Sequence, residues 1–234
     1  MLSFSQSTMG RTLALPLLCF ALAWSQNSVG AQSVAAGSQS GAEAFARALQ
    51  QRYLTIRDFS ADFTQTYRGG VLRTTTAERG TVRVKKPGMM RWRYTNPEPK
   101  EFVSDGRKMF SYIPADRQVF VSNVPPDDQA SSAVLFLAGK GDLVRDFIPA
   151  LIDGGPVGMR VLRLTPRRAE AEYEYLIITS DPATFRIQAL TTRDHQGGES
   201  ALTFANLKEN QGISDTDFVF RMPRGMNVSD ATRN

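Results

Sequence analysis

The chain has very little cysteine and histidine: Cys19 and His195 are each the only residue of their type among 234. One cysteine cannot close a disulfide within the chain, and one histidine without carboxylates at ligand spacing does not indicate a metal site. His195 precedes Gly197–Gly198, which predicts a hairpin turn. Such a turn is a poor place to hold a nucleophile, a base and an orienting acid together.

The sequence also lacks the short motifs of common enzyme classes. It contains no Gly-x-Ser-x-Gly elbow, and Gly154–Gly155 precedes a proline instead of the helix that a phosphate-binding loop requires. We therefore expect a protein that is not an enzyme, with no catalytic residues, no cofactor and no bound metal ion.

The apolar run near the N-terminus is short. Leu13–Ala23 follows Arg11 and cannot cross a bilayer as a folded helix. Small residues follow at Val29-Gly30-Ala31, at the positions that signal peptidase reads. We expect residues 1–31 to be a signal peptide, cleaved after Ala31, and the mature protein to be exported to the periplasm.

A competing hypothesis is that Cys19 belongs to a lipobox and anchors the protein to a membrane. Leu18 stands where that signal requires glycine or alanine, so we favour the cleaved peptide. The mature chain would then contain no cysteine and no thiol chemistry.

The excess of positive charge is small. The formal net charge is +5, and removal of residues 1–31, which carry Arg11 and no acidic residue, lowers it by one to +4. This charge favours contact with anionic lipid surfaces or acidic partners. The arginines are spread along predicted strands and do not cluster with stacking aromatics, so we expect no nucleic-acid partner.

The chain does contain a clear pattern of short strands, best seen from Glu78 to Tyr112. Apolar and cationic residues alternate there, which predicts strands with one apolar and one cationic face. Turns are marked by Pro87–Gly88, Asn96–Pro99 and Asp105–Gly106. The predicted apolar face carries Val82, Val84, Met90, Trp92 and Tyr94, and the cationic face carries Arg83, Lys85, Arg91 and Arg93.

The rest of the chain contains few helical patterns. Residues 41–56 have the period of an amphipathic helix, and the small polar residues 32–40 before them predict a linker. Two short helices are predicted at 130–138 and 142–147, with a loop at 151–156. Without an internal repeat, we expect one domain over residues 41–234. The other predicted strands are 59–67, 71–78, 118–122, 161–165, 173–179, 185–193, 199–208 and 217–222.

Several blocks of residues in a fixed order resemble the LolA family of periplasmic lipoprotein carriers. They are spread over nearly all of the expected mature chain. The blocks are Phe59-Ser60-Ala61-Asp62-Phe63-Thr64-Gln65, Lys85-Lys86-Pro87-Gly88, Arg91-Trp92, Val103-Ser104-Asp105-Gly106, Tyr112 with Pro114, and Phe218-Val219-Phe220 with Pro223, Gly225 and Val228.

The resemblance implies a fold that is mainly β with an α lid. It implies an unclosed antiparallel β-barrel, a strongly curved sheet whose apolar concavity is covered by short helices, here 41–56 and 130–147. It also implies a carrier that receives acylated lipoproteins from an ATP-driven, ABC-type exporter of the inner membrane. The carrier would pass them to a LolB-like acceptor of the outer membrane, and we expect it to be a monomer.

The bulky apolar residues of the predicted concave side are the candidates for a lipid-binding cavity. For any one of them a place in an ordinary core is the simpler interpretation. As a set that includes an adaptable methionine they indicate a cavity. The candidates are Phe59, Phe63, Met90, Trp92, Phe102, Phe110, Tyr112, Leu135, Phe136 and Phe204.

Lys86 is the candidate latch of the lid. In the family an arginine before the proline bonds to the lid and holds the empty form shut, and Lys86 occupies that place here. Lysine keeps the charge but loses the planar fork that grips two carbonyls at once. The alternative is a solvated cation at a strand end.

Two other functions remain open at this point. A related fold serves as a lipid or lipoprotein sensor that acts through a partner protein without delivering cargo. The membrane-anchored acceptor shares the fold but needs a lipobox. The sequence does not name the cargo, since lipoproteins and other lipids present the same methylene groups.

Overall fold

The computed structural model describes residues 29–70, 74–125, 139 and 141–233, with one long helix and one large sheet. The sheet has twelve strands in the order β12-β6-β5-β4-β3-β2-β1-β11-β10-β9-β8-β7. The strands are β1 (Asp58–Arg68), β2 (Thr75–Lys85), β3 (Met89–Asn96), β4 (Lys100–Asp105), β5 (Lys108–Ile113), β6 (Gln118–Asn123), β7 (Phe147–Ile152), β8 (Arg160–Pro166), β9 (Tyr175–Ser180), β10 (Ile187–Arg193), β11 (Glu199–Glu209) and β12 (Asn227–Asp230).

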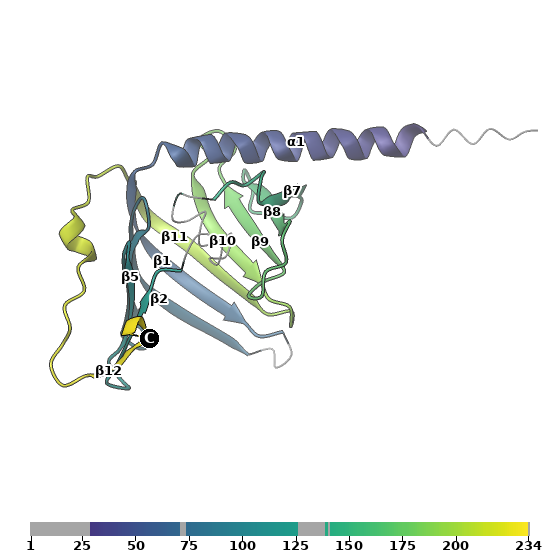
Figure 1. Ribbon diagram of the computed structural model, residues 1–234. Coiled ribbons are helices and arrows are strands. Elements are labelled where there is room, and N and C mark those ends of the chain that lie inside the picture. The colour runs from purple at the N-terminus through teal and green to yellow at the C-terminus, as the bar shows by residue number, and fades with distance from the viewer. Residues whose placement is uncertain (1–28, 71–73, 126–138, 140, 234) are drawn as a thin grey trace, which may run out of the picture.

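The sheet is strongly curved and unclosed (Figure 1). β12 and β7 stand at the two ends of the strand order, so the barrel remains open between them. Neighbouring strands pair antiparallel except β12, which pairs parallel with β6. The expected mainly β, unclosed antiparallel barrel is confirmed.

The turns that join the central strands are those marked in the sequence. Gly88 and Gly106 have φ of +79° and +90°, a backbone conformation that glycine adopts without strain. At the β4–β5 turn the Asp105 carboxylate accepts the N–H groups of Arg107 and Lys108 at 2.8 and 2.7 Å. Local turn chemistry therefore sets the hairpins.

The register places the aromatic residues on one side of the sheet. Trp92 lies opposite Val82 on one neighbouring strand and opposite Phe102 on the other, so all three share the concave face. The arginines of β3 alternate with them and face outward, as the period of two predicted.

Helix α1 (Val29–Leu54) crosses one end of the curved sheet, close to β7–β10 (Figure 1). Its Ala46, Leu49 and Tyr53 are buried in a core formed with residues such as Leu162 and Ile178. The 41–56 periodicity is therefore an amphipathic face on the sheet. In the part of the chain that the structure describes, the cover is one helix of 26 residues, longer than the expected helix over 41–56.

The helix begins before the predicted start, because residues 32–40, where we expected a linker, are helical. The cleavage of residues 1–31 stays a prediction. In the part of the chain that the structure describes, none of the helices combines the length and the apolar character needed to cross a bilayer.

The predicted helix at 142–147 is wrong, and so is the loop at 151–156 at its start. The Asp142 carboxylate binds the N–H groups of Val144 and Arg145 at 2.9 and 2.7 Å, which makes a local turn. The chain then enters β7 at Phe147 and continues to Ile152. The predicted 130–138 helix lies outside the described residues.

The predicted strand at 217–222 is also wrong, because this segment crosses the convex face of the sheet without joining it. Residues Asp215–Phe218 form a 3-10 turn, and pairing resumes only at β12. The segment is held by the cationic face: Arg83 binds Asp217 at 2.6 Å, and Arg91 donates to the Val219 carbonyl at 2.8 Å. The cationic face is thus covered by the chain's own C-terminal part (Figure 1).

Candidate functional site

The concave face carries a row of aromatic side chains across β1, β3 and β4. The rings of Phe63 and Trp92 lie 5.1 Å apart, those of Phe63 and Tyr94 4.9 Å, and those of Tyr94 and Phe102 5.7 Å, all edge to face. Phe63 is buried, whereas Trp92, Tyr94 and Phe102 are half-buried. The row offers a large apolar surface with defined geometry.

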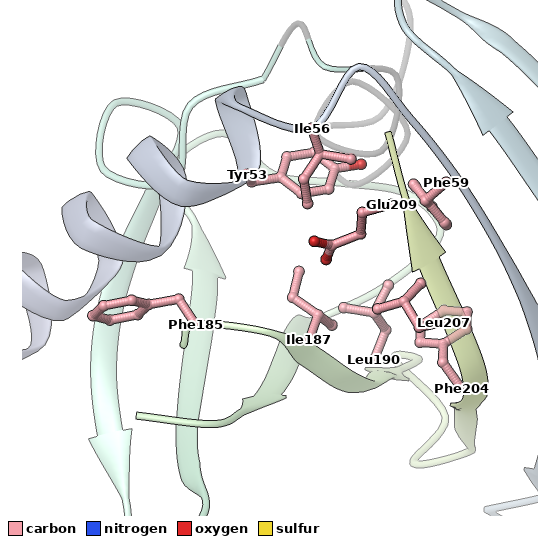
Figure 2. A pocket seen from close by; sticks show the side chains of 9 residues that line it. All are labelled: Tyr53, Ile56, Phe59, Phe185, Ile187, Leu190, Phe204, Leu207 and Glu209. Carbon is pink, nitrogen blue, oxygen red and sulfur yellow. The ribbon is translucent and has the colours of Figure 1, made fainter. Parts of the chain in front are cut away.

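An apolar pocket lies between the end of α1 and strands β1, β10 and β11 (Figure 2). Its empty volume is about 440 Å³, part of it open to solvent. The pocket joins the aromatic row, because Phe204 in its wall lies opposite Phe63 in the β1–β11 register. The wall consists of Tyr53, Ile56, Phe59, Phe185, Ile187, Leu190, Phe204, Leu207 and Glu209.

Lys86 joins the β2–β3 turn to the carboxyl end of α1. Its ammonium donates a hydrogen bond to the Tyr53 carbonyl and lies 3.3 Å from the centre of the Tyr53 ring. A helix end presents unpaired carbonyls and a partial negative charge, so a cation is favoured there. The Lys86 stem also passes against Gly139, where an added Cβ would lie 2.6 Å from Lys86 Cδ.

The surroundings of Lys86 disfavour its charge. Burial and, to a smaller extent, the nearby charge of Arg52 lower the pKa of Lys86 to about 8, although the charge of Glu209 opposes them. Burial likewise raises the pKa of the Tyr53 phenol, which keeps it neutral. The end of α1 therefore lies beside three charged side chains, Arg52, Lys86 and Glu209, that are partly removed from water.

A β-bulge in β11 decides which side chains enter the pocket. Phe204 faces Phe63, and simple alternation would turn Lys208 inward; a register shift opposite Ser60–Asp62 turns Leu207 and Glu209 inward instead. Asn206 sits in the bulge with φ of +52°, and its amide binds Asp62 at 2.7 Å. Alternation alone could not have found this change.

The structure brings most of the described cavity candidates together. Phe59 and Phe204 line the pocket, Phe63 lies beside them in the core, and Met90 and Trp92 pack against that core. Phe102 extends the row through Tyr94. Leu135 and Phe136 lie outside the described residues.

Phe110 and Tyr112 are not part of this surface. Phe110 lies opposite Val103, and Tyr112 lies opposite Glu101, so both face the convex side. There the Phe110 ring stacks on Phe220 at 5.0 Å, and that of Tyr112 lies 6.0 Å from it. The prediction that they share a face with Phe102 is wrong. The register of the β4–β5 hairpin pairs Phe102 with Ser111, so the neighbours of Ser111 on β5 point to the opposite face.

The predicted cavity set lacks six apolar residues of the pocket wall, which come from the end of α1 and the turn after it, from β10 and the turn before it, and from β11: Tyr53, Ile56, Phe185, Ile187, Leu190 and Leu207. Tyr53 and Ile56 were assigned only to the helix face, and alternation in 185–193 could have identified Ile187. Among the described residues, no group of three or more potential metal ligands comes together. His195 lies in the expected turn, where its Nε2 is 2.8 Å from the Glu170 carbonyl.

An open curved sheet with an aromatic concave face, closed at one end by a helix over an apolar pocket, defines a β protein built around an apolar concavity. Comparison with known families identifies which one. The model of "Outer membrane lipoprotein carrier protein LolA" matches residues 55–221, and the chain belongs to the LolA family.

Relatives found by sequence agree with this family. The outer-membrane lipoprotein carrier protein of Neisseria gonorrhoeae is 30% identical over 195 residues, covering 82% of this chain and 89% of the relative. The outer-membrane lipoprotein carrier protein of Bordetella avium is 30% identical over 204 residues, covering 85% of this chain and 90% of the relative. A solved structure of an uncharacterized conserved protein from Thermus thermophilus has a TM-score of 0.50 at 12% identity. The match covers 79% of this chain and 98% of that protein, which shares the fold.

Proposed function

We propose that this protein is a periplasmic carrier that holds the acyl chains of lipoproteins beneath α1 and releases them to an acceptor. The observation that carries the proposal is the apolar pocket under a helix end that Lys86 ties to the sheet. The name of the relatives, outer-membrane lipoprotein carrier protein, supports the class of cargo and favours a carrier over a sensor.

The route follows from this role. The cleaved signal peptide, residues 1–31, would export the chain. An ATP-driven exporter of the inner membrane would load acylated lipoproteins, and a LolB-like acceptor of the outer membrane would receive them. The work is transfer of cargo and needs no catalytic group.

A carrier must hold its cargo without trapping it. Burial of methylene groups contributes about 0.8 kcal/mol each, so one sixteen-carbon chain gains about 12 kcal/mol when fully buried. Release would then be very slow unless the empty form is stabilised by contacts that cargo must break. The carrier therefore needs a closed empty state of low free energy.

The contacts at the end of α1 support such a closed form. Leu49 and Tyr53 of α1 pack into the same core as Phe59 and Phe63 of β1, so we expect the end of the helix to move when an acyl chain enters. Lys86 must then give up its hydrogen bond to the Tyr53 carbonyl. Lys86 thus acts as the latch in this proposal.

Binding and transfer with protein purified from the periplasm test the proposal. N-phenyl-1-naphthylamine, a neutral fluorescent probe, should bind and be displaced by a palmitoylated peptide, and the loaded protein should deliver that peptide to vesicles bearing an acceptor. Replacement of His195 by alanine should change neither result. Failure to bind both the probe and the acylated peptide would overturn the carrier function.

A further inference from the structure

Glu209 is the charged residue in the wall of the otherwise apolar pocket. It ends β11, lies opposite Phe59 in the register, and has a side chain only 11% exposed. Figure 2 shows its carboxylate pointing away from β11 into the space between Tyr53 and Ile187. A surface that binds hydrocarbon gains nothing from a carboxylate at this place.

The position of Glu209 is the product of the bulge in β11. Regular alternation from Phe204 would direct Lys208 inward and Glu209 outward, and the bulge at Asn206 reverses the two. Bulges often serve to re-aim a side chain near a functional site. The left-handed backbone of Asn206 and its bond to Asp62 hold this arrangement.

The carboxylate is paired with Arg52 of α1. The Arg52 guanidinium binds Glu209 Oε2 and donates to the Thr55 hydroxyl at 3.0 Å, with a side chain 33% exposed. This Arg52–Glu209 bridge joins residues 157 positions apart and crosses from the covering helix to the sheet. A buried carboxylate without a partner is strongly unfavourable, so Glu209 depends on the position of α1.

The bridge and Lys86 hold the same helix end from different parts of the sheet, one from β11 and the other from the β2–β3 turn. Lys86 reaches the Tyr53 carbonyl from the β2–β3 turn, and Glu209 reaches the adjacent Arg52 from β11. The two contacts therefore break together if this end of α1 lifts away from the pocket. They differ in their consequence, because only the second leaves a charge among apolar side chains.

We propose that the Arg52–Glu209 bridge is a second closure contact and that Glu209 promotes release of cargo from the pocket. The proposal rests on the carrier function. When α1 moves to admit an acyl chain, Arg52 withdraws and leaves the carboxylate facing hydrocarbon. Glu209 thus raises the free energy of the loaded state relative to the closed empty state, and it weakens cargo binding.

Neutral and charged replacements of Glu209 test this directly. Glu209→Gln removes the charge at nearly constant shape and should bind N-phenyl-1-naphthylamine and a palmitoylated peptide at least ten-fold more tightly, with hand-over slowed by a similar factor. Glu209→Asp keeps the charge but shortens the reach, and it should bind no more tightly than the wild type. The matched control is Glu199→Gln, which removes a carboxylate from the other end of β11, where it pairs with Arg193 at 2.8 Å; its affinity should be unchanged.

Salt gives a test that needs no variant. Raising the salt concentration from about 0.05 to about 0.5 M weakens a partly exposed ion pair, so probe affinity of the wild type should rise and that of Glu209→Gln should stay constant. If Glu209→Gln binds no more tightly and the wild type shows no salt effect while the probe still binds, the bridge is structural only and the carrier function stands. If the wild type binds neither ligand, the carrier function fails and this proposal fails with it.

Discussion

At the residue scale, the site is a small number of polar groups at the edge of an apolar surface. Lys86 meets the carbonyl end of α1, and Glu209 meets Arg52 one residue earlier in the same turn. Neither contact adds apolar area, so neither helps to bind an acyl chain. Both favour the closed helix, and the predictions at this scale concern the balance between closed and loaded forms.

Lys86→Leu should tighten cargo binding. A hydrogen bond from a charged donor contributes about 1.5–3 kcal/mol, and cargo must break this one to enter. We expect affinity for a palmitoylated peptide to rise about ten-fold or more and hand-over to slow. Lys86→Arg, with two donors in a plane, should strengthen the closed form and weaken loading. Equal affinity and release in wild type and Lys86→Leu would show that Lys86 is only a strand-end cation.

Cargo binding should weaken as the pH rises from about 8 to the ordinary lysine value of 10.5. Burial lowers the pKa of Lys86 in the closed form, and the pKa returns toward 10.5 when α1 lifts and the amine meets water. The open form then binds more protons, so loss of protons in this window favours the closed form. Probe titrations from about pH 7 to pH 10.5 should show a flat affinity below pH 8 and a decline above it. Lys86→Leu should lack the decline.

Trp92→Ala should keep the fold but lose most probe binding. Truncation of a large side chain in a full core costs about 3–5 kcal/mol, and Trp92 is half-buried, so we expect a loss of about 1–2 kcal/mol in the free energy of unfolding. The Trp92 ring belongs to the aromatic row and lies next to the Phe63 ring. Circular dichroism and probe fluorescence measure the two effects. A variant that is unfolded at room temperature would mean that Trp92 is part of the core.

At the element scale, the two sides of the sheet are covered in different ways. The concave side packs on the apolar face of α1, whereas the convex cationic face is bound by carboxylates and carbonyls of the C-terminal segment. Lys85 takes part through the Ile213 carbonyl at 2.8 Å. Alternate residues of β2 and β3 therefore contact different elements: the apolar residues face the core beneath α1, and the cationic residues bind the C-terminal segment.

Arg91→Ala should loosen the C-terminal segment. The Arg91 side chain is 16% exposed and binds both Glu101 at 3.2 Å and the Val219 carbonyl. We expect the free energy of unfolding to fall by about 2–3 kcal/mol and amide hydrogen exchange in residues 213–222 to become faster. Arg93→Ala is the control, because Arg93 binds the same carboxylate at 3.2 Å but is 58% exposed; its cost should be below about 1 kcal/mol. Equal exchange in both variants would contradict the role of Arg91.

At the scale of the whole molecule, an unclosed sheet leaves two edge strands. The β7 edge has exposed Ile148, Leu151 and Ile152, the kind of surface that pairs with another strand. Pro149 in the middle of this strand has no N–H to offer to an incoming chain. The proline thus disfavours pairing of this edge with the strand of another molecule.

Pro149→Val should cause concentration-dependent self-association. The change restores an N–H and a β-forming side chain at the edge. Light scattering after size exclusion should show dimers or larger species, in contrast to a monomeric wild type. Pro156→Val in the adjacent loop, whose carbonyl accepts the Met159 N–H at 3.0 Å, is the control and should remain monomeric. A monomeric Pro149→Val would show that the edge is protected by other means.

Much of this fold follows from local sequence. The period of two over β2 and β3, the turns at Pro87–Gly88 and Asp105–Gly106, and the amphipathic pattern of residues 41–56 each act over a few neighbouring positions. The order of blocks pointed to the family for the same reason, since the blocks between Phe59 and Pro114 are strands and turns of the sheet. Phe59, Phe63 and Trp92 were predicted on one surface because regular alternation holds along their strands.

Only the tertiary structure decided where long-range pairing overrides local pattern. Phe110 and Tyr112 turn to the convex side because the β4–β5 register pairs Phe102 with Ser111. The segment 217–222 reads as a strand, yet cations of β2 and β3 hold it as a covering strap. Glu209 enters the pocket because a bulge in β11 shifts the register against β1, and no property of residues 199–209 alone sets that shift.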